Sequence, residues 1–204
     1  MRPGRAAPVC EHGRVQRHVA VLVALGAVLL VAGCASGGTP PVIPPPAPPQ
    51  AVELSWDERA PATGPALVFR VRRFAVTDDG WSSDVEIENR TGIPWLLGEN
   101  PVAVSQSFGI MLFATGEMGE LDQRNRNADL PGLRAAQRFD PALPARLDPG
   151  ASWRGTISAP GTLAAGRWVR VVFGPLVAVG DPPGGMQRQF VWITDHTHRL
   201  RARA

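Results

Sequence analysis

The sequence predicts an all-β fold, an antiparallel β-sandwich, and three observations lead to this prediction. Apolar and polar residues alternate with a period of two along several segments, as in strands with one buried face. Pairs that suit tight turns, such as Asp79-Gly80 and Pro149-Gly150, separate those segments. No long stretch shows the 3.6-residue period of an amphipathic helix. We therefore expect about seven to nine short strands.

The clearest alternation begins soon after residue 51. Apolar residues recur at every second position in residues 52–56 and again in residues 67–76, where the phase shifts at Arg72. Such a shift predicts a β-bulge. After a turn, residues 81–88 place Trp, Ser, Val and Ile on one face and mostly acidic side chains on the other. Arg70 and Arg72 are expected to lie across from those acids on the neighbouring strand.

The later strands are shorter and are separated by turns. Asn89-Arg90-Thr91 matches the N-glycosylation pattern, but we expect an Asn-stabilised turn there. Pro94 limits its neighbours to an edge strand, and a sugar-binding platform at Trp95 is the alternative role for that ring. Strands are expected within residues 93–97, 108–115, 153–157, 168–173 and 190–193.

Two parts of this pattern resemble bacterial immunoglobulin-like envelope domains. They are the strand ending Val85-Glu86-Ile87-Glu88-Asn89-Arg90-Thr91 and, much later, the turn Leu147-Asp148-Pro149-Gly150 before Trp153. The resemblance covers residues 66–194 and implies an immunoglobulin-like sandwich. Many such domains belong to lipoproteins. The cysteine pair of antibody domains is missing from the sequence, so only the sandwich carries over.

The N-terminal region resembles a bacterial lipoprotein signal. An apolar run over residues 19–30 leads into Val31-Ala32-Gly33-Cys34, which is similar to the lipobox. The resemblance implies that residues 1–33 are a signal peptide and that Cys34 becomes the acylated (palmitate-type) first residue. A permanent transmembrane helix is the less favoured alternative, because residues 19–33 span only about 22 Å as a helix, against a ~30 Å hydrocarbon core.

A proline-rich segment follows the cysteine. Residues 40–49 are expected to form an extended polyproline II spacer of about 30 Å. A ligand for a proline-recognition domain is the alternative, but such domains mostly act in the cytosol. The predicted organisation is therefore a signal peptide at 1–33, a lipidated Cys34 with a linker at 34–50, and a sandwich domain at 51–204.

Charge and cysteine content narrow the function further. All 21 basic residues are Arg, and the part from Cys34 onward has 17 Arg and 17 acidic residues. A domain without net charge has no electrostatic reason to bind nucleic acid. Cys10 is predicted to be removed and Cys34 to be acylated, so no disulfide is expected. We expect a protein held at a membrane of the bacterial cell envelope by its N-terminal lipid, with the domain outside the cytoplasm.

His196 and His198 are the only histidines after Cys34 and could begin a zinc or copper site. A zinc site needs three or four protein ligands, so we favour two exposed histidines and keep a ligand-carrying or metal-handling lipoprotein as the alternative function. A triad of Asp195 and His196 with a distant serine is a further alternative, although the sequence has no Gly-x-Ser-x-Gly elbow. The prediction is a non-enzymatic binding or structural module without a cofactor.

The strongest candidate for a binding surface lies in residues 116–146, which show no clean period. Loops this long in compact domains are uncommon and are usually functional or disordered. An exposed surface that contacts an envelope protein is expected within residues 121–133. A simple connection between the two sheets is the equally weighted alternative. The candidate binding residues are Leu121, Asp122, Arg124, Arg126 and Asp129.

Overall fold

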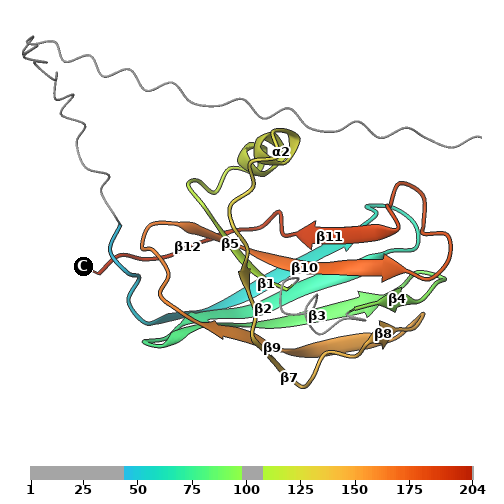
Figure 1. Cartoon of the computed structure of the whole chain (residues 1–204), viewed down its shortest axis with the longest axis horizontal. Helices are drawn as coiled ribbons and strands as arrows, with labels where there is room; N and C mark the ends of the chain where they lie inside the picture. The colour runs from blue at the N-terminus through green and yellow to red at the C-terminus, as the bar shows by residue number, and fades with distance from the viewer. Residues whose placement is uncertain (1–43, 98–107, 204) are drawn as a thin grey trace, which may run out of the picture. The chain divides into compact units, whose positions relative to one another are not determined.

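The computed structural model describes residues 44–97 and 108–203. Within them the chain forms two antiparallel sheets and one short helix (Figure 1). The first sheet, in the order β1-β2-β3-β9-β7, comprises β1 (Gln50–Ala60), β2 (Leu67–Val76), β3 (Gly80–Asn89), β9 (Ser152–Pro160) and β7 (Arg138–Asp140). The all-β sandwich predicted from the sequence is confirmed.

The second sheet has β10 (Trp168–Ala178) at its centre. In the order β6-β5-β10-β4-β8, the other strands are β6 (Arg134–Ala135), β5 (Gly109–Phe113), β4 (Trp95–Leu96) and β8 (Arg146–Leu147). Two more strands also pair with β10, namely β11 (Gln189–Ile193) and β12 (His198–Arg199). Every β-strand that the sequence predicts is present, and the closing strand is followed by β12.

Alternation along each strand decides which side chains enter the core. In β3 the inward-facing side chains are buried, namely Trp81, Ser83, Val85 and Ile87, whereas the outward-facing side chains that alternate with them are half-buried. Phe69 of β2 and Phe173 of β10 meet across the interior, with ring centroids 5.1 Å apart. Aromatic packing of this kind joins the two sheets into one core.

The predicted β-bulge is confirmed, because the pairing of β2 with β3 shifts register just after Val71. Arg70 lies opposite Glu86. Its Nε donates to Asp57 Oδ2 at 2.8 Å, and its Nη1 lies 2.6 Å from Glu86 Oε1 and 3.0 Å from Glu88 Oε2. Burial lowers the pKa of Arg70, but hydrogen bonds to Asp57 and Glu88 outweigh it and raise the pKa above its ordinary value. The prediction is confirmed for Arg70, but it is wrong for Arg72, which lies in the bulge and reaches Asp57 Oδ2 of β1 at 3.9 Å instead of the acids of β3.

The turn after β3 is organised by Asn89, as the sequence predicts. Its Oδ1 accepts hydrogen bonds from Thr91 N at 2.9 Å and Thr91 Oγ1 at 2.6 Å, and its Nδ2 donates to Ile93 O and Leu147 O. Thr91 Oγ1 in turn accepts a hydrogen bond from Trp95 Nε1 at 3.0 Å. The Asn89 side chain is fully buried, which leaves no room for a glycan.

The alternative role of Trp95 as a sugar-binding platform and the edge-strand prediction for its segment are both wrong. The ring is fully buried, so it is not a sugar-binding platform. Its strand, β4, pairs with β10 on one side and with β8 on the other, so it is not at the edge of the sheet. The proline beside it is accommodated because the strand is only two residues long.

The end of the proline-rich segment belongs to the folded part. Ala47 N donates to Leu163 O at 2.7 Å, and Ala165 N donates to Pro45 O at 2.8 Å. Ala47 is buried. Proline lacks an N–H group but keeps its carbonyl, so this short segment can still accept from the connection between β9 and β10. The last residues of the predicted 34–50 linker therefore lie against the sandwich.

The predicted signal peptide, the lipobox and Cys34 lie outside the described residues. Among the residues that are described, no helix has both the length and the hydropathy to cross a membrane. The segment Val42–Ala204 forms one compact unit, and both sheets and their apolar clusters lie within it. We therefore expect this unit to fold without the N-terminal region.

Candidate functional site

The chain leaves the second sheet between β5 and β6, and we name residues 114–133 the α2 excursion. It contains the helix α2 (Met118–Arg126), which lies outside the two sheets (Figure 1). The aperiodic stretch 116–146 was expected to be a loop, but it holds this helix and the short strands β6, β7 and β8. All five candidate binding residues lie in the α2 excursion.

Polar contacts, rather than an apolar face, hold the first turn of α2. Glu120 accepts hydrogen bonds from Thr115 N at 2.9 Å and Thr115 Oγ1 at 2.7 Å. Arg124, one turn further on, donates from Nε to Glu120 Oε1 at 2.9 Å. Burial raises the pKa of Glu120, but the hydrogen bonds from Thr115 and Arg124 outweigh it and lower the pKa below its ordinary value. No residue of α2 is buried, so the sequence carries no helical period there.

A small apolar cluster holds the α2 excursion on the outer face of the second sheet. Met111, Phe113 and Val172 are its buried members. Five half-buried side chains pack against them, namely Leu121, Leu130, Leu133, Trp168 and Ile193. Leu121 lies in α2, and Leu130 and Leu133 lie after it, so the cluster holds the excursion at both ends. The outward side of α2 therefore keeps a fixed position on the sheet.

Arg170 on β10 is fully buried and ties the start of α2 to the segment after β11. Its Nη1 donates to Thr194 O and to Asp195 O, both at 2.6 Å, and its Nη2 donates to Glu117 O at 3.1 Å. The guanidinium also lies 5.2 Å from the centroid of the Phe113 ring, within cation–π range. Burial lowers the pKa of Arg170, although the nearby Asp195 charge opposes that shift.

The structure brings two of the five candidate residues together. Arg124 Nη1 lies 3.1 Å from Asp129 Oδ2 and 3.2 Å from Asp129 O. Asp122 and Arg126 are exposed on α2, whereas Leu121 is half-buried in the apolar cluster. Four of the five therefore offer polar groups to a partner, and Leu121 anchors the helix.

A polar cavity of about 440 Å³ opens along α2. It is lined by Thr115, Glu117, Glu120, Gln123, Arg124, Asn127 and Asp129. The lining offers amide, hydroxyl and carboxylate groups together with one guanidinium. This arrangement suits polar side chains of a binding partner better than an apolar ligand.

Glu58 and His196 form a second polar centre, at the side where β1 faces the segment after β11. Glu58 is buried, and its carboxylate accepts hydrogen bonds from Trp192 Nε1 at 2.7 Å, Asp195 N at 3.0 Å and His196 N at 2.9 Å. His196 Nδ1 lies 2.6 Å from Glu58 Oε1, and its ring stacks on Trp56. The alternation of residues 52–56, continued along the strand, places Glu58 on the same inward face as Trp56. A carboxylate at an inward position was the sequence signal for this centre, and the sequence analysis missed it.

Glu58 orients the imidazole of His196, as the acidic residue of a catalytic triad does, but the described residues place no nucleophilic serine beside that imidazole. Throughout residues 44–97 and 108–203, no serine hydroxyl hydrogen-bonds to the His196 ring. Burial, and next the Glu58 charge, raise the pKa of Asp195 above its ordinary value. The contacts of Glu58 are those of a clamp between the two sheets.

The two histidines lie in different surroundings. His196 stacks on Trp56 and is engaged by Glu58, whereas the His198 ring lies 6.5 Å from the Phe74 ring. Burial lowers the pKa of His198. In the part of the chain that the structure describes, no group of three or more His, Cys, Asp or Glu side chains is placed to hold a metal ion.

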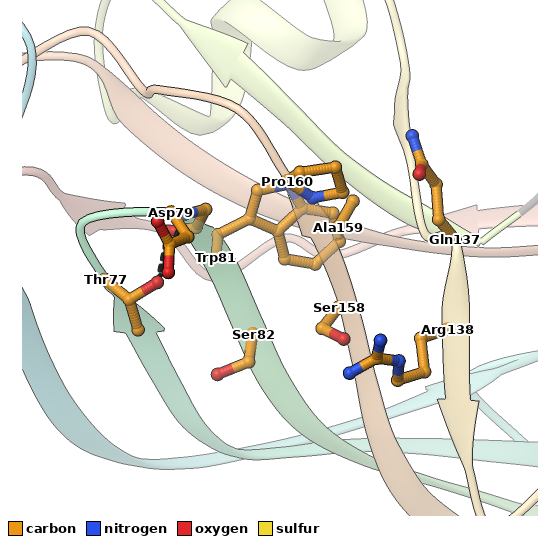
Figure 2. Close-up of a pocket in the computed structure, with 10 residues that line it drawn as sticks. Thr77, Asp79, Trp81, Ser82, Gln137, Arg138, Ser158, Ala159 and Pro160 are labelled. Carbon is orange, nitrogen blue, oxygen red and sulfur yellow. Dashed lines mark hydrogen bonds between the residues drawn. The ribbon is translucent and has the colours of Figure 1, made fainter.

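A cavity of about 570 Å³ lies at one end of the first sheet, and Figure 2 shows the side chains that line it. Ser82 of β3 pairs with Ser158 of β9, which pairs in turn with Arg138 of β7, so two hydroxyls and a guanidinium lie in a row. Trp81 also lines the cavity, but it is buried and packs against Phe74. The lining therefore offers hydroxyl, carboxylate, amide and guanidinium groups.

Comparisons with known proteins return no matching family model, no similar curated protein and no similar solved structure.

Proposed function

We propose that this chain is a lipid-anchored protein of the bacterial cell envelope and that its β-sandwich acts as a non-enzymatic binding module. In this proposal the outward side of α2 faces a protein partner. The lipid on Cys34 holds the module at the membrane, and the residues between Cys34 and the folded unit separate the two. The lipobox-like sequence at residues 31–34 supports the anchor.

The observation that carries the proposal is a helix with no buried residue that is nevertheless held firmly in place. A helix of nine residues is too short to persist alone in water. Here Glu120 and Arg170 fix its first turn, and Leu121 anchors it to the sheet. At its start, Met118 has a relative exposure of 67%, so one large apolar side chain is available for contact there. These features support a surface kept in shape for a partner.

The surface also indicates the chemistry of the partner. Asp122 and Arg126 place opposite charges on the exposed part of α2, close to the apolar Met118. Non-obligate protein interfaces combine apolar contacts with a polar rim, and Met118 with its charged neighbours offers both. The expected partner is a protein surface with complementary charges and a recess for Met118.

The anchor has its own test. The intact mass of detergent-extracted protein is expected to equal the chain from Cys34 onward plus acyl chains. Cys34→Ala is expected to remove the acylation and leave the sandwich folded, because the folded unit begins beyond that residue. An unmodified N-terminus upstream of Cys34 would contradict the anchor.

The partner surface is tested by replacing residues 122–129 with a short Gly-Ser link. Crosslinking of the lipoprotein in its native envelope is expected to lose its partner band. The free energy of unfolding should change by less than about 1 kcal/mol, because no residue of α2 is buried. A partner band of unchanged strength would show that the α2 excursion is only a connector.

A further inference from the structure

A third cavity, of about 550 Å³, lies beside the α2 excursion at the point where the proline-rich segment meets the sandwich. We name it the arginine cleft. Its lining includes Arg124, Arg134 and Arg167, with Asp129 as its one acidic residue, and Pro44 forms part of its rim. Three guanidinium groups around one cavity make it attractive to an anion.

The charges in the arginine cleft are only partly compensated. Arg124 is paired with Glu120 and Asp129. Arg134 donates one hydrogen bond from Nη1, to Thr162 O at 3.2 Å. Across residues 44–97 and 108–203, neither Arg134 nor Arg167 forms an ion pair. Two cations therefore line the cavity with most of their N–H groups available to a ligand.

The donor set favours a phosphate group. Each guanidinium presents N–H donors in a planar fork that matches pairs of oxygens. A carboxylate has two oxygens and satisfies one such fork, whereas a phosphate has enough oxygens to meet both Arg134 and Arg167. A phosphate can carry two negative charges, whereas a carboxylate carries one. The phosphate charge therefore matches more closely the two positive charges of Arg134 and Arg167.

The position of the cleft indicates where such a group is available. Pro44 at the rim is ten residues from Cys34. An extended chain of that length reaches about 30 Å. If Cys34 is acylated, as proposed above, the cleft is tethered within that distance of the phosphates of membrane lipids.

We propose that the arginine cleft is a phosphate-binding site in which Arg134 and Arg167 hold the phosphate oxygens. The phosphate belongs either to a lipid headgroup or to a small soluble molecule. The membrane source rests on the lipid anchor of the proposed function, whereas the site itself does not.

The test uses residues 35–204, which contain the compact unit and lack the acylated cysteine. Binding of inorganic phosphate is measured by titration calorimetry, and binding to vesicles of phosphatidylcholine with or without phosphatidylglycerol is measured by flotation. Arg134→Gln and Arg167→Gln are each expected to weaken phosphate binding about tenfold, as loss of one charged hydrogen-bonding group does. Arg134→Gln/Arg167→Gln combines the two changes. Its control is Arg154→Gln/Arg188→Gln, which removes the same charge from two exposed residues outside the cleft.

Each outcome decides the proposal. Binding of phosphate or of phosphatidylglycerol vesicles that the Arg134→Gln/Arg167→Gln variant loses and the control keeps supports the site. Vesicle binding identifies a headgroup as the source, and phosphate binding alone identifies a soluble molecule. Binding of neither probe, or equal loss in the control, overturns the site. Because this protein lacks Cys34 and retains α2, these results are independent of both tests of the proposed function.

Discussion

Glu58→Ala is expected to lower the free energy of unfolding by about 3–5 kcal/mol, because a buried carboxylate with several donors loses all of its contacts at once. Trp192 Nε1, two backbone N–H groups and His196 Nδ1 all converge on this carboxylate. Removing it leaves these donors without their acceptor and loosens β1 from the segment after β11. Urea unfolding of residues 35–204 measures the effect.

Two further variants serve as controls for Glu58→Ala. Glu58→Gln keeps one carbonyl oxygen as an acceptor and is expected to lose less stability than Glu58→Ala. Glu53→Ala removes a carboxylate from the same strand whose side chain is 84% exposed, and it should change the free energy by less than about 1 kcal/mol. If Glu58→Ala behaves like Glu53→Ala, the clamp between the sheets does not exist.

Phe173→Ala is expected to destabilise the domain by about 3–5 kcal/mol, the usual cost of removing a large aromatic ring from a packed core. The Phe173 ring is fully buried. It packs against Phe69 of the first sheet and against Phe108, which directly precedes β5 of the second sheet, with ring centroids 5.1 Å and 6.3 Å away. Trp153→Ala is expected to have an effect of the same size, since Trp153 packs on Phe139 and donates to Ala142 O.

Thermal or urea unfolding of these variants tests the orientation of the strands. Val191→Ala is the matched control, because Val191 lies on β11 and is 47% exposed. It should shift the free energy of unfolding by less than about 1 kcal/mol. A Phe173→Ala shift near zero would mean that the faces of β10 are assigned the wrong way round.

The strands could be predicted because a half-buried strand repeats every two residues. The alternation of residues 81–88 gives the inward face of β3 directly, and the phase shift at Arg72 gives the bulge. The pairing of Arg70 with acids on the neighbouring strand followed from the same alternation. Each of these predictions depends on local sequence and on one neighbouring strand.

The α2 excursion could not be predicted in this way. Helix α2 is held by Glu120, Arg170 and Leu121 rather than by an apolar stripe, so its sequence has no helical period. Arg170 is itself buried among strand residues that favour the interior, and its partners are backbone carbonyls far away in the sequence. Such contacts become visible only when the fold brings the segments together.

The sequence therefore singled out the segment that carries α2, but not the helix itself or its contacts. A long stretch without hydrophobic periodicity, residues 116–146, pointed to the segment that contains Asp122, Arg124 and Arg126. It gave no indication of the Arg124–Asp129 contact or of the cavities on either side. The arginine cleft joins residues of the α2 excursion to Arg167, and no spacing in the sequence connects them.

Position-resolved crosslinking tests the central claim most directly, the claim that the outward side of α2 faces the partner. A photoreactive side chain is placed at position 122 or 126 on α2 and, as the control, at exposed position 154 on the outer face of the first sheet. In the native envelope, positions 122 and 126 are expected to crosslink to one partner, and position 154 to give no such product. Equal or stronger crosslinking from position 154 would contradict the account and place the binding surface on the first sheet.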